Sequence, residues 1–270
     1  MKIKKIFCKS ILNKTGIPVG DYALNPYTGC EHSCIYCYAV FMKRFSGHKE
    51  SWGNFVDIKI NAADILHKQL NKLKPGTILL GTVTDPYQPS EKKYKITRSC
   101  LKELVNSNFP VSVQTKSSLI LRDMDLIKEI KDIEIGFTIT IFDEKIRKFF
   151  EPKSSTTEDR FKALYELSNQ NIKTFLFFGP VIPYFSDNED VIDKIFKYAT
   201  KSSVDNILID SLNAYPKVWS KVRKLIEKKF PEILSYYKFF YFERNLYKQE
   251  LITKIKRIAK NYKIPYHFCF

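Results

Sequence analysis

Short apolar runs rich in β-branched residues alternate with longer amphipathic segments along most of this chain. Each run is too short and too β-branched to be a helix. Strands that alternate with helices form parallel βαβ units with right-handed crossovers, and about six such units predict a partial (β/α)6 TIM-like barrel. A short first strand is expected near Asp21–Leu24. The other five are expected at Thr77–Val83, Val111–Thr115, Ile133–Ile141, Thr174–Ile182 and Asn206–Asp210.

Helices are expected between these runs. Asn61 can N-cap a helix that runs to about Lys72. Ser155 and Glu158 form a capping-box pattern ahead of a helix that carries Phe161. Further helices are predicted at Thr97–Asn106, Met124–Lys131, Asp143–Phe150, Asn188–Thr200 and Lys217–Lys229.

The residues after the barrel pattern are expected to form an extension that packs on the barrel or closes its open side. Tyr237–Glu243 has the composition of a strand, Asn245–Asn261 that of a basic helix, and Ile264–Phe270 is an apolar ending. We therefore expect an N-terminal segment (1–20), a core domain (21–215) and a C-terminal extension of helices with short strands (216–270).

Three cysteines follow the first predicted strand with the spacing Cys30-x-x-x-Cys34-x-x-Cys37. Their thiolates can converge on one metal centre, one ligand short of the four that close a structural zinc site or a fully ligated iron–sulfur cluster. A [4Fe–4S] cluster held at three irons leaves the fourth iron open to a small molecule. Two other interpretations remain: a zinc site completed by His32 or His48, and unrelated buried cysteines.

The cysteine spacing, with Tyr36 directly before the third cysteine, resembles the cluster motif of the radical S-adenosylmethionine (radical SAM) enzymes. The resemblance implies that a [4Fe–4S] cluster on the three cysteines binds S-adenosylmethionine (SAM). It also implies reductive cleavage of SAM to a 5′-deoxyadenosyl radical, which abstracts hydrogen from a substrate. The electron would come from a donor of the flavodoxin or ferredoxin type.

Four further stretches, within roughly residues 20–215, resemble the spore photoproduct lyase branch of that superfamily, whose members often carry a DNA repair label. They are Gly81–Glu91, Thr115–Asp123, Glu151-Pro152 and Gly179–Asp187. One departure matters. The position where spore photoproduct lyase carries a hydrogen-donating cysteine is Thr82 here, and an O–H bond is too strong to donate a hydrogen atom readily. This departure argues against repair of spore photoproduct by that route.

Three residues at the predicted strand ends are candidates to bind SAM. Thr84 and Asp85 offer a hydroxyl and a carboxylate on a turn, suited to an ammonium group or a ribose. Lys116 follows a strand expected to be buried, and in the spore photoproduct lyase pattern the lysine here contacts the carboxylate of SAM. The alternatives are a plain turn cap for Thr84 and Asp85, and a rim lysine for Lys116.

The adenosine part of SAM has its own candidate contacts. Thr138 and Thr140 alternate with apolar residues, so both hydroxyls are expected on one side of the fourth strand, near the ribose. By the resemblance, Tyr38 packs near the adenine, and Gly179 and Val181 lie where backbone approaches it. A strand with one polar face and a core tyrosine would give the same pattern.

The charge balance favours an anionic partner. Lys plus Arg number 45 against 29 Asp plus Glu, a net charge of +16, which suits phosphate neutralisation and makes nucleic acid a candidate partner. Solvated lysines on helices are the alternative. The expected contributors are Lys248, Lys254, Lys256, Arg257 and Lys260 of the basic helix, with Lys43 and Arg44 beside the cysteine loop.

Composition also bears on compartment and on rival functions. No apolar run approaches the roughly 18 residues of a transmembrane helix, and the cysteines do not form a spaced disulfide framework, so we expect a cytoplasmic protein that does not enter membranes. The leading hypothesis is a radical SAM enzyme with an anionic, nucleic-acid-like substrate. Its rivals are radical SAM modification of RNA, peptide or a small molecule, and a non-catalytic iron–sulfur or zinc module that binds nucleic acid.

Overall fold

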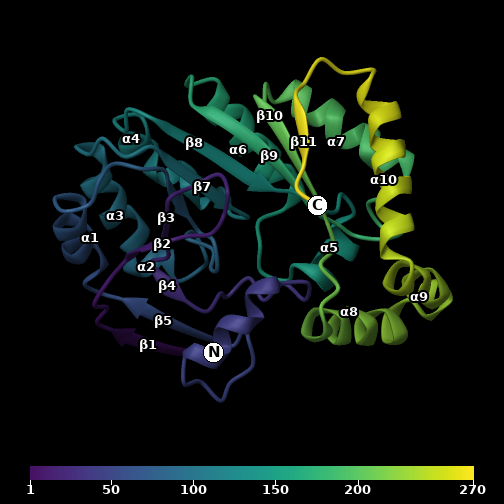
Figure 1. Cartoon of the computed structure of the whole chain (residues 1–270), viewed down its shortest axis with the longest axis horizontal. Coiled ribbons are helices and arrows are strands. Elements are labelled where there is room, and N and C mark those ends of the chain that lie inside the picture. The colour runs from purple at the N-terminus through teal and green to yellow at the C-terminus, as the bar shows by residue number, and fades with distance from the viewer.

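Eight strands form one sheet in the order β11-β10-β9-β8-β7-β6-β3-β2 in a computed structural model that describes all 270 residues. Every neighbouring pair is parallel except β2 with β3. The edge strands β2 and β11 do not pair, so the sheet stays open as a partial barrel (Figure 1). All six predicted strands are confirmed. The strands are β2 (Leu12–Lys14), β3 (Tyr22–Leu24), β6 (Ile78–Leu80), β7 (Val111–Thr115), β8 (Ile133–Thr138), β9 (Lys173–Val181), β10 (Asn206–Ser211) and β11 (Tyr266–Phe268).

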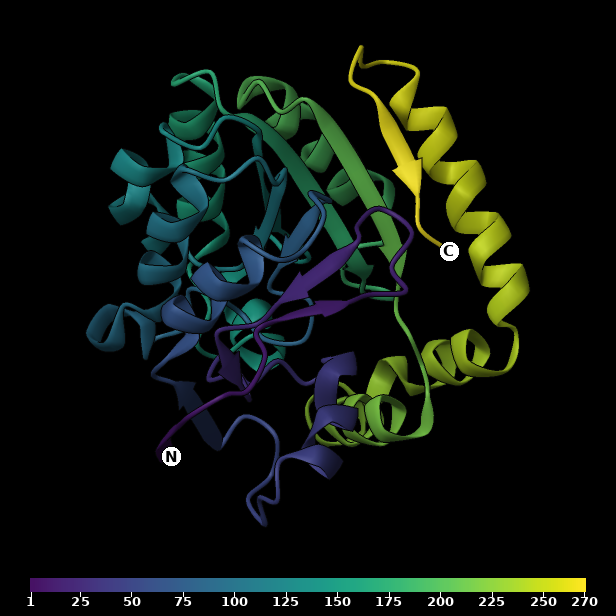
Figure 2. The ribbon, with the colours of Figure 1, turned by 60° about the vertical axis from the view of Figure 1, so that its left-hand side comes forward.

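Helices pack on the outside of this sheet and bury an apolar stripe against it (Figure 2). Helix α7 is typical: the Asn188 side chain accepts a hydrogen bond from Val191 N (3.0 Å), and the residues buried after that cap, Ile192, Ile195 and Phe196, recur at helical spacing. The elements are η1 (Tyr38–Phe45), α1 (Ala62–Leu70), α2 (Glu91–Tyr94), α3 (Ile96–Val105), η2 (Ser118–Asp123), α4 (Met124–Ile127), α5 (Glu144–Phe150), α6 (Thr157–Ser168) and α7 (Glu189–Lys201).

Two predicted helix caps differ from the structure. Asn61 precedes α1, but its side chain clamps the backbone of Cys8, accepting from Cys8 N (2.8 Å) and donating to Cys8 O (2.9 Å). The capping box of α6 begins one residue later than predicted, because Thr156 Oγ1 accepts from Asp159 N (3.0 Å). Ser155 is occupied elsewhere: its hydroxyl accepts from Ser118 N (3.0 Å).

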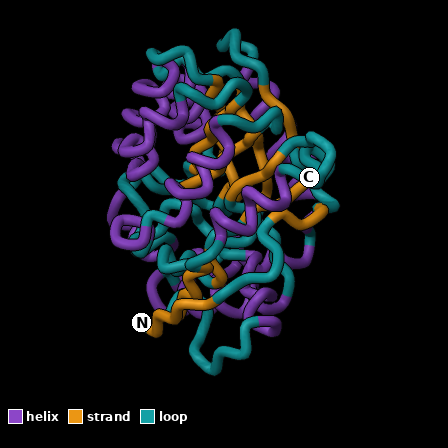
Figure 3. The backbone as a smooth tube through the Cα atoms, turned by 90° about the vertical axis from the view of Figure 1, so that its left-hand side faces the viewer, coloured by secondary structure: helices purple, strands orange, loops and turns teal.

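A second, three-stranded sheet was not predicted. It has the order β1-β5-β4, from β1 (Lys2–Ile6), β5 (Phe55–Lys59) and β4 (Tyr27–Thr28). Four of the five residues of β1 are exposed, so the strand carries little apolar signal. In Figure 3 the strand at the N-terminus lies apart from the main group of strands. Because β4 belongs to the cysteine segment, this small sheet fixes where that segment sits.

The C-terminal extension is helical until its last strand. It comprises α8 (Pro216–Lys229), η3 (Pro231–Ile233), α9 (Leu234–Phe242), α10 (Arg244–Ala259) and β11. The prediction of a strand at Tyr237–Glu243 is wrong, because Tyr237 and Phe240 are buried three residues apart, and Tyr241 stacks on Trp219 of α8 with ring centroids 4.3 Å apart. The apolar ending forms β11, which joins the large sheet parallel to β10.

Asp187, in the loop between β9 and α7, holds the extension against the barrel. Asp187 is 3% exposed, and its carboxylate accepts hydrogen bonds from the hydroxyls of Tyr236 (2.8 Å) and Tyr247 (3.0 Å), while its backbone carbonyl accepts from Lys254 Nζ (2.6 Å).

The predicted division at residues 20 and 215 stays a prediction. None of the helices has the length and apolar character needed to cross a bilayer.

Candidate active site at the mouth of the barrel

The C-terminal ends of the parallel strands meet at one edge of the sheet, which we call the mouth. Strand-end loops at this edge carry the chemistry of barrel enzymes. The cysteine loop, residues 29–37, comes after β3 and β4 and contains all three candidate ligands. The structure also brings to the mouth, from successive strand ends, Asp85, Lys116, Thr138, Val181, Asp210 and Cys269.

The three thiols lie together in a largely buried loop. Cys30 and Cys34 are buried, Cys37 is partly exposed, and burial raises the pKa of all three thiols. A cluster would therefore displace three protons as it binds. No three His, Cys, Asp or Glu side chains surround a point where one metal ion would sit. In a [4Fe–4S] cluster each of the three thiolates would bind a different iron.

The histidines proposed as zinc ligands have other partners. His48 Nε2 lies 2.8 Å from Asp57 Oδ1, its Nδ1 lies 3.1 Å from Glu50, and its ring stacks on Phe55. His32 Nδ1 lies 3.2 Å from Asp85 Oδ2. Carboxylates engage both ring nitrogens of His48, so His48 is not free to complete a zinc site with the cysteines, whereas only Nδ1 of His32 faces a carboxylate.

Thr84 and Asp85 hold neighbouring loops together. Thr84 Oγ1 donates to Gly29 O and accepts from Gln88 Nε2 (3.0 Å). The Asp85 carboxylate accepts from Thr115 Oγ1 (2.7 Å) and from Lys116 N (2.8 Å). Although burial acts to raise it, the nearby His32 ring and these donors keep the pKa of Asp85 below its usual range. These contacts match the turn-cap alternative, and a direct contact of either residue with SAM stays a prediction.

Lys116 lies beside the cysteines over a buried charge network. Its Nζ is 5.9 Å from the centre of the Tyr36 ring, and its charge lowers the pKa of Cys34 and Cys37 against the effect of burial. The Tyr36 hydroxyl donates to Glu151, which also pairs with Arg160. Glu151 and Arg160 are fully buried. Burial would raise the pKa of Glu151, but the Arg160 and Lys116 charges hold it at about 2.

The two threonines of the fourth predicted strand do not share a partner. Strand β8 ends at Thr138, whose hydroxyl accepts from Gln114 Nε2 (3.0 Å). Thr140 lies beyond the last residue of β8 and donates to Glu151 (2.8 Å). The expectation that both hydroxyls lie near the ribose of SAM stays a prediction.

The residues expected near the adenine, Tyr38 and Val181, come from different elements. Tyr38 begins η1, is 48% exposed, and donates its hydroxyl to Thr82 O. Tyr215 donates to Tyr38 O (2.7 Å) from the start of α8. Val181 is fully buried at the end of β9, opposite Ser211. Their contacts with SAM stay predictions.

Two further groups lie at the mouth, and Asp210 was not identified from the sequence as one of them. Asp210 is the penultimate residue of β10, and burial raises its pKa to about 6. Cys269 follows β11 and donates its backbone N–H to Ile209 O (2.8 Å), which places it beside Asp210. No motif points to Asp210, and Cys269 reaches the mouth because the extension folds back as β11.

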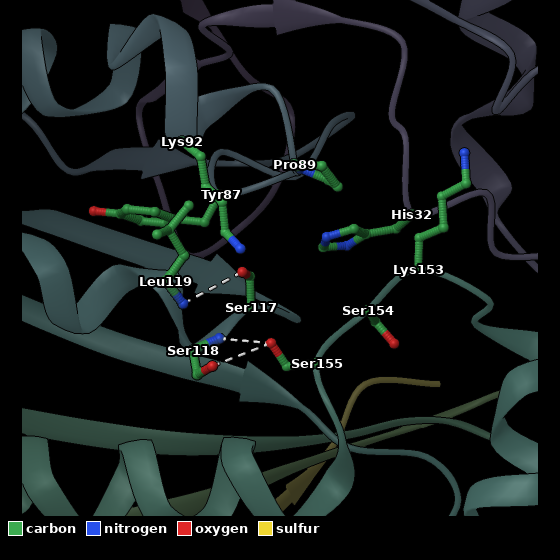
Figure 4. Close-up of a pocket in the computed structure, with 10 residues that line it drawn as sticks. All are labelled: His32, Tyr87, Pro89, Lys92, Ser117, Ser118, Leu119, Lys153, Ser154 and Ser155. Carbon is green, nitrogen blue, oxygen red and sulfur yellow. Dashed lines mark hydrogen bonds between the residues drawn. The ribbon is translucent and has the colours of Figure 1, made fainter. Parts of the chain in front are cut away.

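A cavity of about 370 Å³ opens beside the cysteine loop (Figure 4). Its walls come from the loops after β6 and β7 and from the turn between α5 and α6. Hydroxyls dominate, and Ser118 and Ser155 are joined across it (3.2 Å). Two lysines at its edge give it a positive character. The lining residues are His32, Tyr87, Pro89, Lys92, Ser117, Ser118, Leu119, Lys153, Ser154 and Ser155.

Comparison with known proteins decides the family. The family model described as "Radical SAM superfamily" matches residues 24–195. The chain belongs to the radical SAM superfamily. Radical SAM enzymes use a [4Fe–4S] cluster and SAM, so these are its cofactors. The thiol trio, with Lys116 and the buried network behind it, fits the cluster.

The chain is similar in sequence or in fold to the following proteins. An uncharacterised protein of Methanocaldococcus jannaschii is 37% identical over 232 residues, covering 86% of this chain and 85% of that protein. Spore photoproduct lyase of Clostridium acetobutylicum is 25% identical over 171 residues, covering 62% of this chain and 48% of that protein. A solved spore photoproduct lyase mutant with bound AdoMet and dinucleoside spore photoproduct is similar in fold, with a TM-score of 0.70 at 13% identity, covering 99% and 82% of the two chains.

Proposed function

We propose that this radical SAM enzyme acts on an anionic, nucleic-acid-like substrate at the mouth of the barrel. When bound, the cluster and SAM supply a carbon radical that removes a hydrogen atom from the substrate. The residues of the chain bind and orient these groups. The observation that carries the proposal is a row of lysines on α8 that leads to the cysteine loop.

That row lies on one face of α8. Lys217, Lys221, Lys224 and Lys228 follow one another at steps of four, three and four residues, the spacing of one helical face. None of them has an acidic partner, and the ion pair on this helix joins Arg223 to Glu227 (2.6 Å). We call these four residues the α8 lysine row.

The α8 lysine row begins next to the cluster site. Helix α8 packs against η1, which follows Cys37 directly (Figures 1 and 2). Burial lowers the pKa of Lys221, the neighbouring Lys43 lowers it further, and Cys37 raises it. Lys221 thus lies near both Cys37 and Lys43, and neither lysine has an acidic partner. A backbone phosphate would neutralise them there.

The similarity to spore photoproduct lyase supports a nucleic-acid-like substrate but not the same lesion. A solved relative in that group carries a dinucleoside. In this chain the loop has Thr82 where that family carries a hydrogen-donating cysteine, and the Thr82 hydroxyl accepts from Asn25 Nδ2 (2.9 Å). We therefore propose hydrogen abstraction from a nucleic acid without assigning the repair reaction.

Lys116 is the residue we propose to hold the carboxylate of SAM. Anaerobically reduced protein with SAM should release 5′-deoxyadenosine, measured by chromatography, and single-stranded DNA or RNA should speed its release. Lys116→Ala should weaken SAM binding by about 1.5–3 kcal/mol, roughly 10- to 150-fold in Kd, the range for a hydrogen bond to a charged group.

Lys162→Ala is the matched control, because Lys162 is exposed and pairs with Glu158 on α6 (2.7 Å). It should bind SAM as the unmodified protein does. Equal SAM affinity in the Lys116 variant would remove that residue from the site. No release of 5′-deoxyadenosine from protein that holds about four irons would overturn the activity. If no nucleic acid speeds the release of 5′-deoxyadenosine, the substrate is a peptide or a small molecule instead.

A further inference from the structure

The cysteine loop approaches β5 and the loop before it closely at two glycines. Gly53 has φ +98°, and a Cβ there would lie 2.2 Å from Ser33 Oγ, inside the cysteine loop. Gly29, at the start of the cysteine loop, has φ +88°, and its Cβ would lie 2.3 Å from Phe55 O. Only glycine allows both approaches. The two loops are therefore fixed relative to one another.

Trp52 sits between these two contacts and faces the cysteines. It is 5% exposed and belongs to a small apolar cluster with Cys30 and Phe55, against which Cys37 packs. The Trp52 ring meets the Phe55 ring edge-on, at 5.7 Å and 85°. Phe55 in turn stacks on His48, which Asp57 holds at 2.8 Å. The indole therefore has little freedom to turn.

The indole N–H of Trp52 is a buried donor without a partner. Its Nε1 makes no hydrogen bond to any group of the chain. A buried donor left unpaired costs about 1–3 kcal/mol, so such a group in a well-packed loop calls for a nearby acceptor. The candidate acceptor is the sulfur of Cys37, which packs against the apolar cluster that contains Trp52.

We propose that the Trp52 indole N–H donates a hydrogen bond to the Cys37 sulfur when the cluster is bound, and that this bond raises the reduction potential of the cluster. Hydrogen bonds to the ligand sulfurs are among the factors that set such potentials. The sulfurs carry more negative charge after one-electron reduction, so a fixed donor stabilises the reduced form more than the oxidised form. Trp52 is thus a positioning residue for electron uptake, whatever the substrate.

Trp52→Phe keeps the edge-on ring contact and removes the donor. We expect the one-electron reduction equilibrium of the reconstituted protein to become about tenfold less favourable, which is ~59 mV more negative for a one-electron couple. The measurement is an EPR-monitored redox titration under anaerobic conditions. Iron and sulfide content, about four of each per chain, must be equal in the proteins compared.

Trp219→Phe is the matched control, since the chain has two tryptophans and Trp219 stacks on Tyr241 in the extension. Its potential should equal that of the unmodified protein. An unchanged potential in Trp52→Phe with an intact cluster would overturn the proposal.

A second measurement covers the case in which Trp52→Phe fails to hold the cluster. Protein labelled with ¹⁵N in the indole should show a ¹⁵N coupling to the reduced cluster by pulsed EPR. The coupling should persist in Trp219→Phe. Its absence from the unmodified protein would also overturn the proposal, and neither result depends on the identity of the substrate.

Discussion

Burial and charge act against each other on the carboxylates around the mouth. Glu151 is fully buried, yet Arg160 and Lys116 keep its pKa at about 2. For Asp210, burial outweighs the backbone hydrogen bond at Ser211 and the charge of Lys248, so its pKa rises to about 6. Of the two, Asp210 is therefore the carboxylate that changes charge near neutral pH.

Asp210 makes a pH-dependent contribution to stability whose sign follows from its raised pKa. The folded protein holds this proton up to about pH 6, whereas the unfolded chain releases it near pH 4. Stability from this group is complete below the unfolded pKa and is lost as the pH rises through the folded pKa. Asp210→Asn should thus stabilise the protein at pH 8 by roughly 2 kcal/mol, with little gain at pH 4.

The measurement is the thermal midpoint of the protein without its acid-labile cluster at both pH values. Asp205→Asn is a poor control because Asp205 accepts from Thr174 N (2.7 Å), so Asp190→Asn, exposed in the first turn of α7, is used instead. Equal shifts at pH 4 and pH 8 would show that Asp210 titrates normally.

At the scale of elements, the close contact between the loop before β5 and the cysteine loop restricts which residue can occupy position 53. Gly53→Ala should prevent cluster loading, because φ +98° is strained for alanine and the added Cβ would strike Ser33 at 2.2 Å. Gly47→Ala is matched to it, with φ +66° but nothing within 4 Å of the added Cβ. It should cost about 1–2 kcal/mol of stability and keep the cluster.

Iron per chain after anaerobic reconstitution distinguishes the two glycine variants. We expect about four irons for Gly47→Ala and far fewer for Gly53→Ala. If Gly53→Ala loads normally, the loop before β5 does not position the cysteine loop.

Elements were predictable where their apolar pattern is local. Strand β7 (Val111–Thr115) has the predicted bounds, because its β-branched residues are all buried and alternate with the partly exposed Ser112 and Gln114. Helix α9 was mistaken for a strand since its aromatic residues favour strands, and their burial against α8 depends on packing that the sequence does not show. Strand β1 pairs with β5 across some fifty residues, so the local sequence of neither strand indicates the pairing.

The site was predictable only where residues are close in sequence. Cys30, Cys34 and Cys37 lie within eight residues, and their spacing alone indicates a metal centre. Trp52 reaches the same centre from a loop that carries no motif, and Asp210 from the end of another strand. Contacts of that kind arise from the tertiary fold, so spacing cannot reveal them.

Over the whole molecule, the positive charge is arranged differently from the sequence-based expectation. In α10, Lys254 donates to Asp187 O (2.6 Å), Arg257 pairs with Glu189, and Lys248 lies over the Phe270 ring (5.2 Å). These three therefore hold the extension in place, although they were expected to bind phosphate. The α8 lysine row has no such partners and lies closer to the cluster site.

Binding of nucleic acid should accordingly depend on α8 more than on α10. Replacing Lys217, Lys224 and Lys228 together by Gln should reduce the slope of log K against log salt by about 2–3 units, since each lost phosphate contact removes about 0.7–0.9. The measurement is fluorescence anisotropy with a labelled oligonucleotide over a range of salt concentrations.

A triple Gln variant of Lys256, Lys260 and Lys263 removes the same charge from the end of α10 and the turn after it, where all three are exposed. Its slope should stay near that of the unmodified protein. Equal loss in both triple variants would mean that net charge, and no particular surface, attracts the nucleic acid.

The last strand has a practical consequence for anyone who handles this protein. Strand β11 runs parallel to β10, so the residues after Phe268 emerge at the mouth beside Asp210. A purification tag or fusion partner attached after Phe270 would start at the rim where substrate must enter. An affinity handle is better joined ahead of β1, at the outer edge of the small sheet, where it leaves that entrance clear.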